Sequence, residues 1–202
     1  MRGILNLLVP AILLAGLAAC QPQPATPVVF GPWEEGLTLA YEDPSQPQPR
    51  RSENRLQVRV AHSTMGPEAP GLVRLDLATT RGQMSVLVRH QDGGIDLVEE
   101  GGRILARLLP AHFPDISHWV DQDAEFRVIG RATWEGAALL PTTSDPVGVW
   151  VETHSPQGLR RRTLYLPNLG EVESRVERDG SWVVVNRLVA RGFTDLPVIK
   201  RP

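Results

Sequence analysis

The sequence predicts an all-β fold, mainly antiparallel, in which a curled sheet forms an open or closed β-barrel with little helix. Apolar and polar residues alternate with a period of two along most of the chain after residue 54, as in strands that bury one face. Asp-Gly pairs separate some of these runs, and helical spacing is nearly absent. Many strands with short connections favour a sheet that curls on itself.

The alternating runs define the expected strands. In chain order these cover residues 56–60, 73–77, 83–89, 95–98, 126–132, 147–152, 159–166, 172–176 and 182–189, and residues 33–41 could form an additional first strand. Residues 103–109 have apolar spacing that suits a helix, but Pro110 and Pro114 would stop it early, and a strand is an equal alternative.

Two Asp-Gly pairs predict tight hairpins. Asp92-Gly93 and Asp179-Gly180 each lie between two alternating runs. Both central residues of a type I′ turn need positive φ, which Asp and Gly tolerate. We therefore expect an antiparallel hairpin at each pair.

The N-terminus has the pattern of a secretory signal peptide. Arg2 precedes an apolar run from Ile4 to Leu17, which is shorter than the roughly 20 residues that span a bilayer. The run ends in Leu17-Ala18-Ala19-Cys20, which resembles the lipobox of bacterial lipoproteins. The resemblance implies cleavage before Cys20 and lipidation of its sulfur. Gln21 is not the Asp that tends to retain enterobacterial lipoproteins on the inner membrane, so the resemblance favours the periplasmic face of the outer membrane.

These features divide the chain into three parts. Residues 1–19 are the expected signal peptide, and residues 20–32 are the lipidated cysteine and a Pro-rich tether. Residues 33–202 are the expected single β-domain, with a Pro-rich loop at 44–52 that could also continue the tether. Folding could therefore begin near residue 30 or near residue 54.

Composition excludes several kinds of chemistry. Removal of residues 1–19 leaves 20 basic and 23 acidic side chains, so no basic excess would attract nucleic acid. Cys20 is the only cysteine, and its lipidation would leave no thiol for a disulfide, a metal site or a nucleophile. We expect no cofactor and no nucleic-acid partner.

The C-terminal half resembles uncharacterised envelope lipoproteins whose domains form a curled antiparallel sheet, broadly similar to lipoprotein carriers of the Lol type. The stretch Thr163-Leu-Tyr-Leu-Pro-Asn-Leu-Gly-Glu-Val172 carries the resemblance. In those proteins a strand ends in an aromatic residue, a Pro-x-x-Gly turn follows, and a valine strand comes next. Asn168 and Leu169 stand where the family often has glycine and valine. The resemblance implies a fold and no catalytic residues.

Four tryptophans are the candidate ligand-binding residues. They lie in or beside expected strands and could line an apolar cavity, although packing in the core is the competing explanation. They are Trp119, Trp134, Trp150 and Trp182.

Other polar groups are weaker candidates for a site. Asp121, Asp123 and Glu125 would share one face of a single strand and could bind a hard cation, although a solvated face explains them as well. His112, Asp115 and His118 suit a polar loop. We expect His62, His90 and His154 at the surface. In Arg160-Arg161-Arg162, alternation sends the middle side chain to the face opposite its neighbours.

The chain contains no Gly-x-Ser-x-Gly elbow and no phosphate-binding Gly-rich loop. We therefore expect a non-enzymatic, membrane-anchored extracytoplasmic lipoprotein that binds a hydrophobic ligand or lipid. The alternative is a structural or assembly module that binds another envelope protein. A hydrolase or metal-dependent enzyme is the third possibility.

Overall fold

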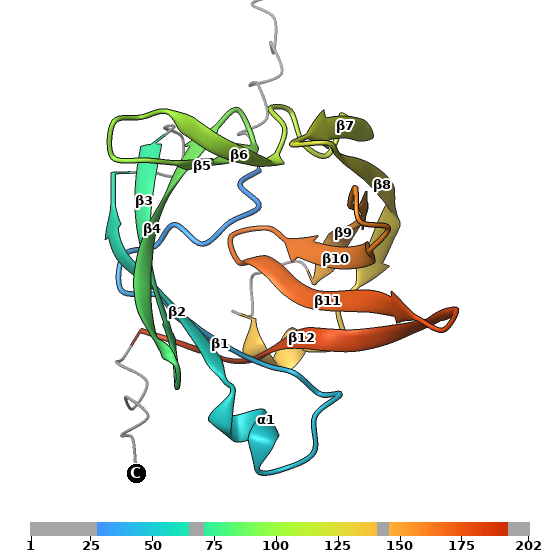
Figure 1. Cartoon of the computed structure of the whole chain (residues 1–202). Helices are drawn as coiled ribbons and strands as arrows, with labels where there is room; N and C mark the ends of the chain where they lie inside the picture. The colour runs from blue at the N-terminus through green and yellow to red at the C-terminus, as the bar shows by residue number, and fades with distance from the viewer. Residues whose placement is uncertain (1–27, 65–70, 141–145, 194–202) are drawn as a thin grey trace, which may run out of the picture.

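The computed structural model describes residues 28–64, 71–140 and 146–193, and within them it confirms the predicted fold class. Twelve strands form one antiparallel sheet that curls into a nearly closed barrel (Figure 1). The strands are β1 (Thr38–Glu42), β2 (Leu56–Ser63), β3 (Gly71–Thr79), β4 (Gly82–Gln91), β5 (Gly94–Val98), β6 (Ile104–Leu109), β7 (His118–Asp121), β8 (Ala124–Thr133), β9 (Val147–His154), β10 (Arg160–Leu166), β11 (Gly170–Arg178) and β12 (Ser181–Gly192). Two short helical turns, α1 (Arg50–Glu53) and η1 (Ala137–Leu139), lie between strands.

The sheet consists of two meanders joined through its first and last strands. Its order is β6-β5-β4-β3-β2-β1-β12-β11-β10-β9-β8-β7, so β1 pairs with both β2 and β12. The two edge strands, β6 and β7, come from the middle of the chain and are not paired as a ladder. The Arg107 N–H donates to Asp121 Oδ2 at 3.1 Å, and the Gln122 amide donates to the Leu105 carbonyl. Side-chain contacts therefore join the barrel at this seam.

The turn residues confirm the two predicted hairpins. Asp92 and Gly93 have φ of 50° and 78°, and Asp179 and Gly180 have φ of 50° and 75°. A third turn has the same property without an Asp-Gly pair, because Gln122 and Asp123 have φ of 48° and 64° between β7 and β8. The prediction of three carboxylates on one strand is therefore wrong: Asp121 ends β7, Asp123 lies in the turn and Glu125 lies in β8.

The sequence left residues 103–109 open between a helix and a strand, and the structure shows a strand. Ile104–Leu109 forms β6, which pairs with β5 through two irregularities. The first strand begins later than residue 33, because Gly36 has φ of 85° and β1 starts at Thr38. The four residues Thr38–Tyr41 of β1 are all buried, as suits a strand in the middle of a sheet that is covered on both faces.

The core includes a residue at the earlier of the two expected starts of folding, near residue 30. Phe30, which the sequence assigns to the tether, is buried and packs its ring edge-on against Phe113 at 4.8 Å between centroids. The Pro-rich loop is ordered by hydrogen bonds between its own residues. Arg51 donates to the carbonyls of Pro44 and Gln46, and α1 follows within the same loop.

Candidate functional site

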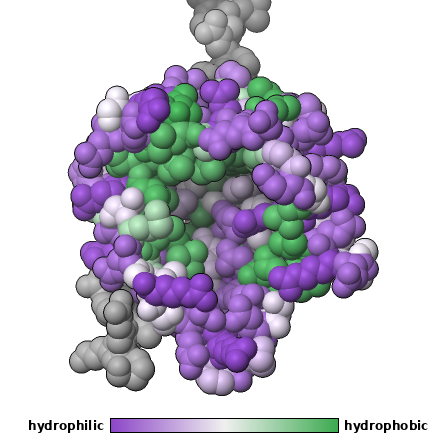
Figure 2. All heavy atoms as spheres, viewed as in Figure 1, coloured by the Kyte–Doolittle hydropathy of each residue, from purple (hydrophilic) through white to green (hydrophobic). Residues whose placement is uncertain are grey.

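A cavity of about 360 Å³ lies inside the barrel. Its walls come from the segment at residues 30–32 and from strands on both sides of the barrel, β3 to β6 and β8 to β11. Figure 2 shows a hollow in the face of the molecule that is seen in Figure 1, with apolar side chains on its rim. The volume falls near the lower end of the range for small-molecule pockets, about 300–1,000 Å³.

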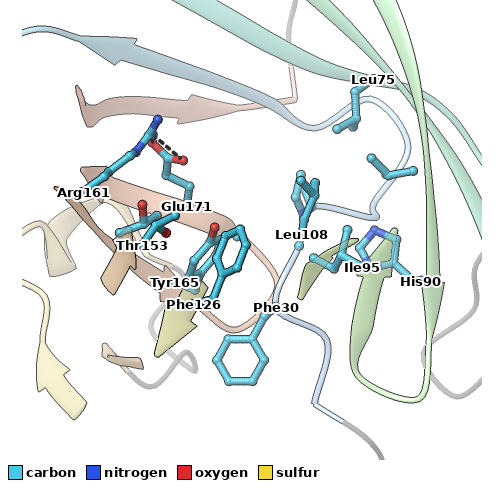
Figure 3. A pocket seen from close by; sticks show the side chains of 15 residues that line it. Phe30, Leu75, His90, Ile95, Leu108, Phe126, Thr153, Arg161, Tyr165 and Glu171 are labelled. Carbon is cyan, nitrogen blue, oxygen red and sulfur yellow. Dashed lines mark hydrogen bonds and ion pairs between the residues drawn. The ribbon is translucent and has the colours of Figure 1, made fainter. Parts of the chain in front are cut away.

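One wall of the cavity is apolar. Leu75 of β3, Val88 of β4 and Ile95 of β5 face inward, and Leu108 of β6 completes the wall. Phe126 of β8 closes the apolar surface from the other side of the barrel (Figure 3). Val88 and Ile95 are nearly inaccessible, whereas Leu108 is 40% exposed. The apolar surface therefore extends from the deep part of the cavity to the barrel rim.

The opposite wall is polar and comes mainly from β10. Arg161, Thr163 and Tyr165 alternate along the strand and all line the cavity. The register between β10 and β11 shifts at this point, since Leu164 pairs with Glu173 and Tyr165 with Glu171. Strand β11 thus has one unpaired residue between Glu171 and Glu173, which makes a β-bulge. The bulge turns the Glu171 side chain into the cavity, on the same face as Ser174.

These side chains form a connected hydrogen-bond cluster. Arg161 Nη2 lies 2.9 Å from Glu171 Oε1 and 2.7 Å from Ser174 Oγ. The Ser174 hydroxyl donates to Glu171 Oε1 at 2.8 Å, and the Asn186 amide donates to the same oxygen at 2.7 Å. Arg161 keeps 42% of its side chain exposed, so solvent reaches this wall. The cluster pairs one positive charge, on Arg161, with one negative charge, on Glu171.

His90 is a buried polar group in the apolar wall. It is only 3% exposed, and neither ring nitrogen has a hydrogen-bond partner within the described part of the chain. Burial lowers its pKa to about 4, because removal from water disfavours the charged imidazolium. His90 is therefore neutral at pH 7. The prediction of a surface position for this residue is wrong, whereas His62 and His154 are exposed as expected.

The segment that precedes β1 spans the barrel and forms the base of the cavity. A Cβ on Gly31 would lie 2.5 Å from His90 Cε1, and a Cβ on Gly170 would lie 3.2 Å from Pro32 Cδ. The segment thus touches β4 on one side and the start of β11 on the other. Figure 1 shows it, in blue, crossing between the two sides.

The Pro-x-x-Gly turn anchors that segment. Gly170 has φ of 79° and Asn168 has φ of 62°, and both residue types tolerate this conformation. The Asn168 N–H donates to the Val29 carbonyl at 2.7 Å, and its side-chain oxygen accepts from Trp33 Nε1 at 3.1 Å. The Asn168 side chain therefore has a specific role at this turn, because its oxygen holds Trp33.

Two tyrosines, the buried Tyr41 and the partly buried Tyr165, complete the surroundings of Glu171. Burial, assisted by the negative charge of Glu171, raises the pKa of both Tyr41 and Tyr165. Both phenols therefore stay protonated at neutral pH. The Tyr41 hydroxyl donates to the Glu171 carbonyl at 2.8 Å.

The four predicted tryptophans are not gathered in one place, and none of them lines the cavity. Trp119 is buried and stacks on Phe126 at 5.1 Å, so it supports the cavity wall from behind. Trp134 is buried in the core. Trp182 lies beneath the guanidinium groups of Arg160 and Arg162, and Trp150 lies beneath that of Arg175. Ligand contact by any of them stays a prediction.

The three consecutive arginines divide between the two faces of β10, as alternation predicts. Arg161 points into the cavity, while Arg160 and Arg162 bond Glu152 on the other face at 3.0 Å and 2.7 Å. Burial alone would raise the pKa of Glu152, but hydrogen bonds from His154, Arg162 and Arg160 outweigh it and lower the pKa to about 2.

Other candidate groups stay apart or lie beyond the described residues. His112, Asp115 and His118 are all exposed, and the described residues contain no cluster of three or more potential metal ligands. No helix in residues 28–64, 71–140 or 146–193 is both long and apolar enough to cross a membrane. Cys20 lies outside the described residues.

Sequence reasoning missed the residues that build the cavity. By alternation His90 lies on the same face of β4 as Val86 and Val88, and this was a usable signal for its burial. Glu171 had no such signal, since its direction depends on the bulge.

Comparison with known proteins gives distant structural likenesses. No protein-family model and no curated protein match the chain. A structure from Bacteroides fragilis, described as a "putative exported protein with YmcC-like fold", covers 82% of this chain and 99% of its own at 15% identity and a TM-score of 0.47. A "putative lipoprotein" from Parabacteroides distasonis gives the same coverage at 12% identity and a TM-score of 0.46. At these values neither description is transferred to this chain.

Proposed function

We propose that the protein is an extracytoplasmic lipoprotein, anchored through Cys20, whose barrel holds a single-chain amphipathic ligand such as a fatty acid or lysolipid. It acts as a binding protein and not as an enzyme. The observation that carries this proposal is the cavity, with its apolar wall on β3 to β6 and its hydrogen-bonding wall on β10 and β11.

The size and lining of the cavity favour this class of ligand. A volume of about 360 Å³ suits one chain better than the two chains of a phospholipid. The apolar wall would cover the chain, and burial of apolar surface contributes about 25 cal/mol per Å². The cluster around Arg161 and Glu171 would bond the polar head. His90 and Tyr165 both line the cavity and stay neutral at pH 7, so they add no net charge to its wall.

The anchor is supported by the lipobox at Leu17–Cys20. Each buried methylene of an acyl chain contributes about 0.8 kcal/mol, and stable anchoring takes more than one chain, as a diacylglyceryl group provides. Gln21 favours the periplasmic face of the outer membrane. Replacement Cys20→Ser should abolish the mobility shift caused by lipid and release the protein from sedimenting membranes. Unchanged processing and sedimentation would contradict the anchor.

Native mass spectrometry tests the ligand. The protein, extracted from its own membranes in mild detergent, should carry one additional mass of a single-chain lipid that is released on denaturation. A denatured aliquot of the same preparation identifies the lipid and serves as the control. Repeatedly empty spectra would reject the ligand proposal while leaving the anchor intact.

The alternative function is assembly with another envelope protein through a sheet edge. The outer edges of β6 and β7, which no ladder joins within the described residues, are the observation that favours it, because a sheet edge can accept another strand. In-cell crosslinking should then give one discrete protein adduct, which deletion of residues 44–52 removes if the Pro-rich loop takes part. Absence of such an adduct counts against assembly.

A further inference from the structure

Exposed apolar side chains concentrate at the seam between β6 and β7. Ile104, Leu105 and Leu108 of β6, Ile116 of the following loop and Val120 of β7 are between 38% and 59% exposed. We call these five residues the apolar rim. Most other exposed apolar residues, such as Leu72 and Met84, are single positions on different strands. Isolated exposed apolar residues are ordinary, whereas a group marks a contact surface.

The N-terminal segment starts at the same end of the barrel as the apolar rim. A Cβ on Gly93, in the β4–β5 turn, would lie 3.2 Å from the Phe113 carbonyl and 3.6 Å from the Val28 carbonyl. Phe113 belongs to the loop that joins β6 to β7, and the neighbouring His112 N–H donates to the Asp92 carbonyl of that turn. Val28, itself 49% exposed, therefore lies beside the rim's own loop.

The expected anchor is close to this end. Eight peptide steps separate Cys20 from Val28, and a fully extended chain of that length reaches at most about 29 Å. The longest strand, β12, has 12 residues and measures about 40 Å. A chain held at Cys20 therefore keeps the Val28 end of the barrel near the bilayer, and the rim is the apolar surface at that end.

Two arginines beside the rim are paired with carboxylates. Arg103 bonds Glu99 at 2.6 Å, and Arg107 lies 3.3 Å from Asp96. This arrangement provides little net positive charge for anionic headgroups, so apolar contact would dominate. A bilayer fits this surface, and the contact should not require anionic lipid or low salt.

We propose that the apolar rim inserts into the interfacial region of the membrane that carries the lipid anchor, and that the ligand exchanges between that membrane and the cavity across the rim. The inference rests on the proposed function for the ligand and the anchor. Leu108 links the two sites, because it belongs to the rim and also lines the cavity. Interfacial insertion of apolar side chains reaches about 5–10 Å into the headgroup and acyl boundary.

Depth-dependent quenching tests the contact. The lipidated full chain would carry one added cysteine with a fluorescent label, either Leu105→Cys in the rim or Arg81→Cys in the β3–β4 turn. Arg81 lies at the opposite end of β4 from Gly93, and β4 has 10 residues, or about 33 Å. In phosphatidylcholine vesicles that contain brominated lipid, fluorescence should be lost at Leu105 and kept at Arg81. Equal behaviour of the two labels would overturn the inference.

Two further readouts separate the possible failures. Leu105→Asp should slow transfer of a fluorescent fatty acid from vesicles to the protein about tenfold, which corresponds to loss of roughly 1.4 kcal/mol of apolar contact, while its affinity in solution stays unchanged. If the fatty acid never binds, the ligand proposal fails, and the labels still report on membrane contact. A photocrosslinker at Leu105 that captures one discrete protein instead of lipid would overturn the membrane assignment.

Discussion

His90 shows how one residue departs from the ordinary behaviour of its type. A histidine usually titrates near pH 6.5, but this ring is enclosed by the barrel with no polar partner in the described chain. Burial therefore lowers its pKa to about 4. The ring behaves as a neutral, partly apolar element of the cavity wall at physiological pH.

This shift makes stability depend on pH with a defined sign. The unfolded chain binds a proton at His90 below about pH 6.5, whereas the folded chain does so only below about pH 4. Stability is therefore lost as pH falls between these values, by about 3 kcal/mol for this group. Urea unfolding of the wild type and of His90→Phe from pH 7 to pH 4 should show a smaller loss in the variant. Parallel pH profiles would contradict the burial of a neutral ring.

Gly31 gives a steric test at the same position. The added Cβ of Gly31→Ala would meet His90 Cε1 at 2.5 Å and Ile95 Cδ1 at 2.9 Å. Both side chains would have to move, at a cost of about 1–3 kcal/mol. Gly101→Ala is the matched control, because its nearest neighbour lies 4.0 Å away. Thermal or urea unfolding should separate the two variants, and equal stability would refute tight packing of this segment.

At the scale of a single element, strand β10 carries two ionic clusters, one on each of its faces. Its inward face presents Arg161 to Glu171, and its outward face presents Arg160 and Arg162 to Glu152. Glu152 is nearly buried and receives bonds from three basic side chains, so its charged form is strongly favoured.

Glu152→Gln should therefore destabilise the protein at pH 7 by about 1–3 kcal/mol. The folded pKa of about 2 lies below the ordinary value of 4.5. The stabilisation is consequently present above pH 4.5 and is lost as pH falls toward 2. Unfolding free energies of wild type and variant should converge over that interval. The exposed Glu99→Gln serves as a control with no measurable change, and equal effects of the two substitutions would contradict the difference in burial.

Turns that depend on the conformational preferences of their own residues were predictable from the sequence. Features that depend on how two strands pair were not. The Asp-Gly hairpins follow from residues that tolerate positive φ. Strand β7 has only four residues, too few for a clear alternation. The bulge opposite Tyr165 leaves no mark in the sequence, yet it decides that Glu171 faces the cavity. The tryptophan content of the strands could not show which face of the sheet each ring occupies. Trp150 and Trp182 in fact lie away from the cavity, where they stack beneath Arg175 and Arg162.

At the scale of the whole molecule, two meanders and one crossing segment create the cavity. β1 joins the meanders by pairing with β2 and β12, and the segment at residues 30–32 bridges the barrel from β4 to β11. The β6–β7 seam lacks a ladder. The barrel is therefore most easily opened at the seam, beside the apolar rim.

Titration with the fluorescent fatty acid cis-parinaric acid tests the cavity most directly. Wild type and Leu72→Trp should bind one equivalent, whereas Leu75→Trp should bind at least about tenfold more weakly, because its added ring occupies the space of the chain. The two leucines lie on opposite faces of β3, with Leu75 in the cavity wall and Leu72 42% exposed. Circular dichroism should show that both variants keep the β-fold. Equal binding by all three proteins, or none by the wild type, would contradict a ligand site inside the barrel.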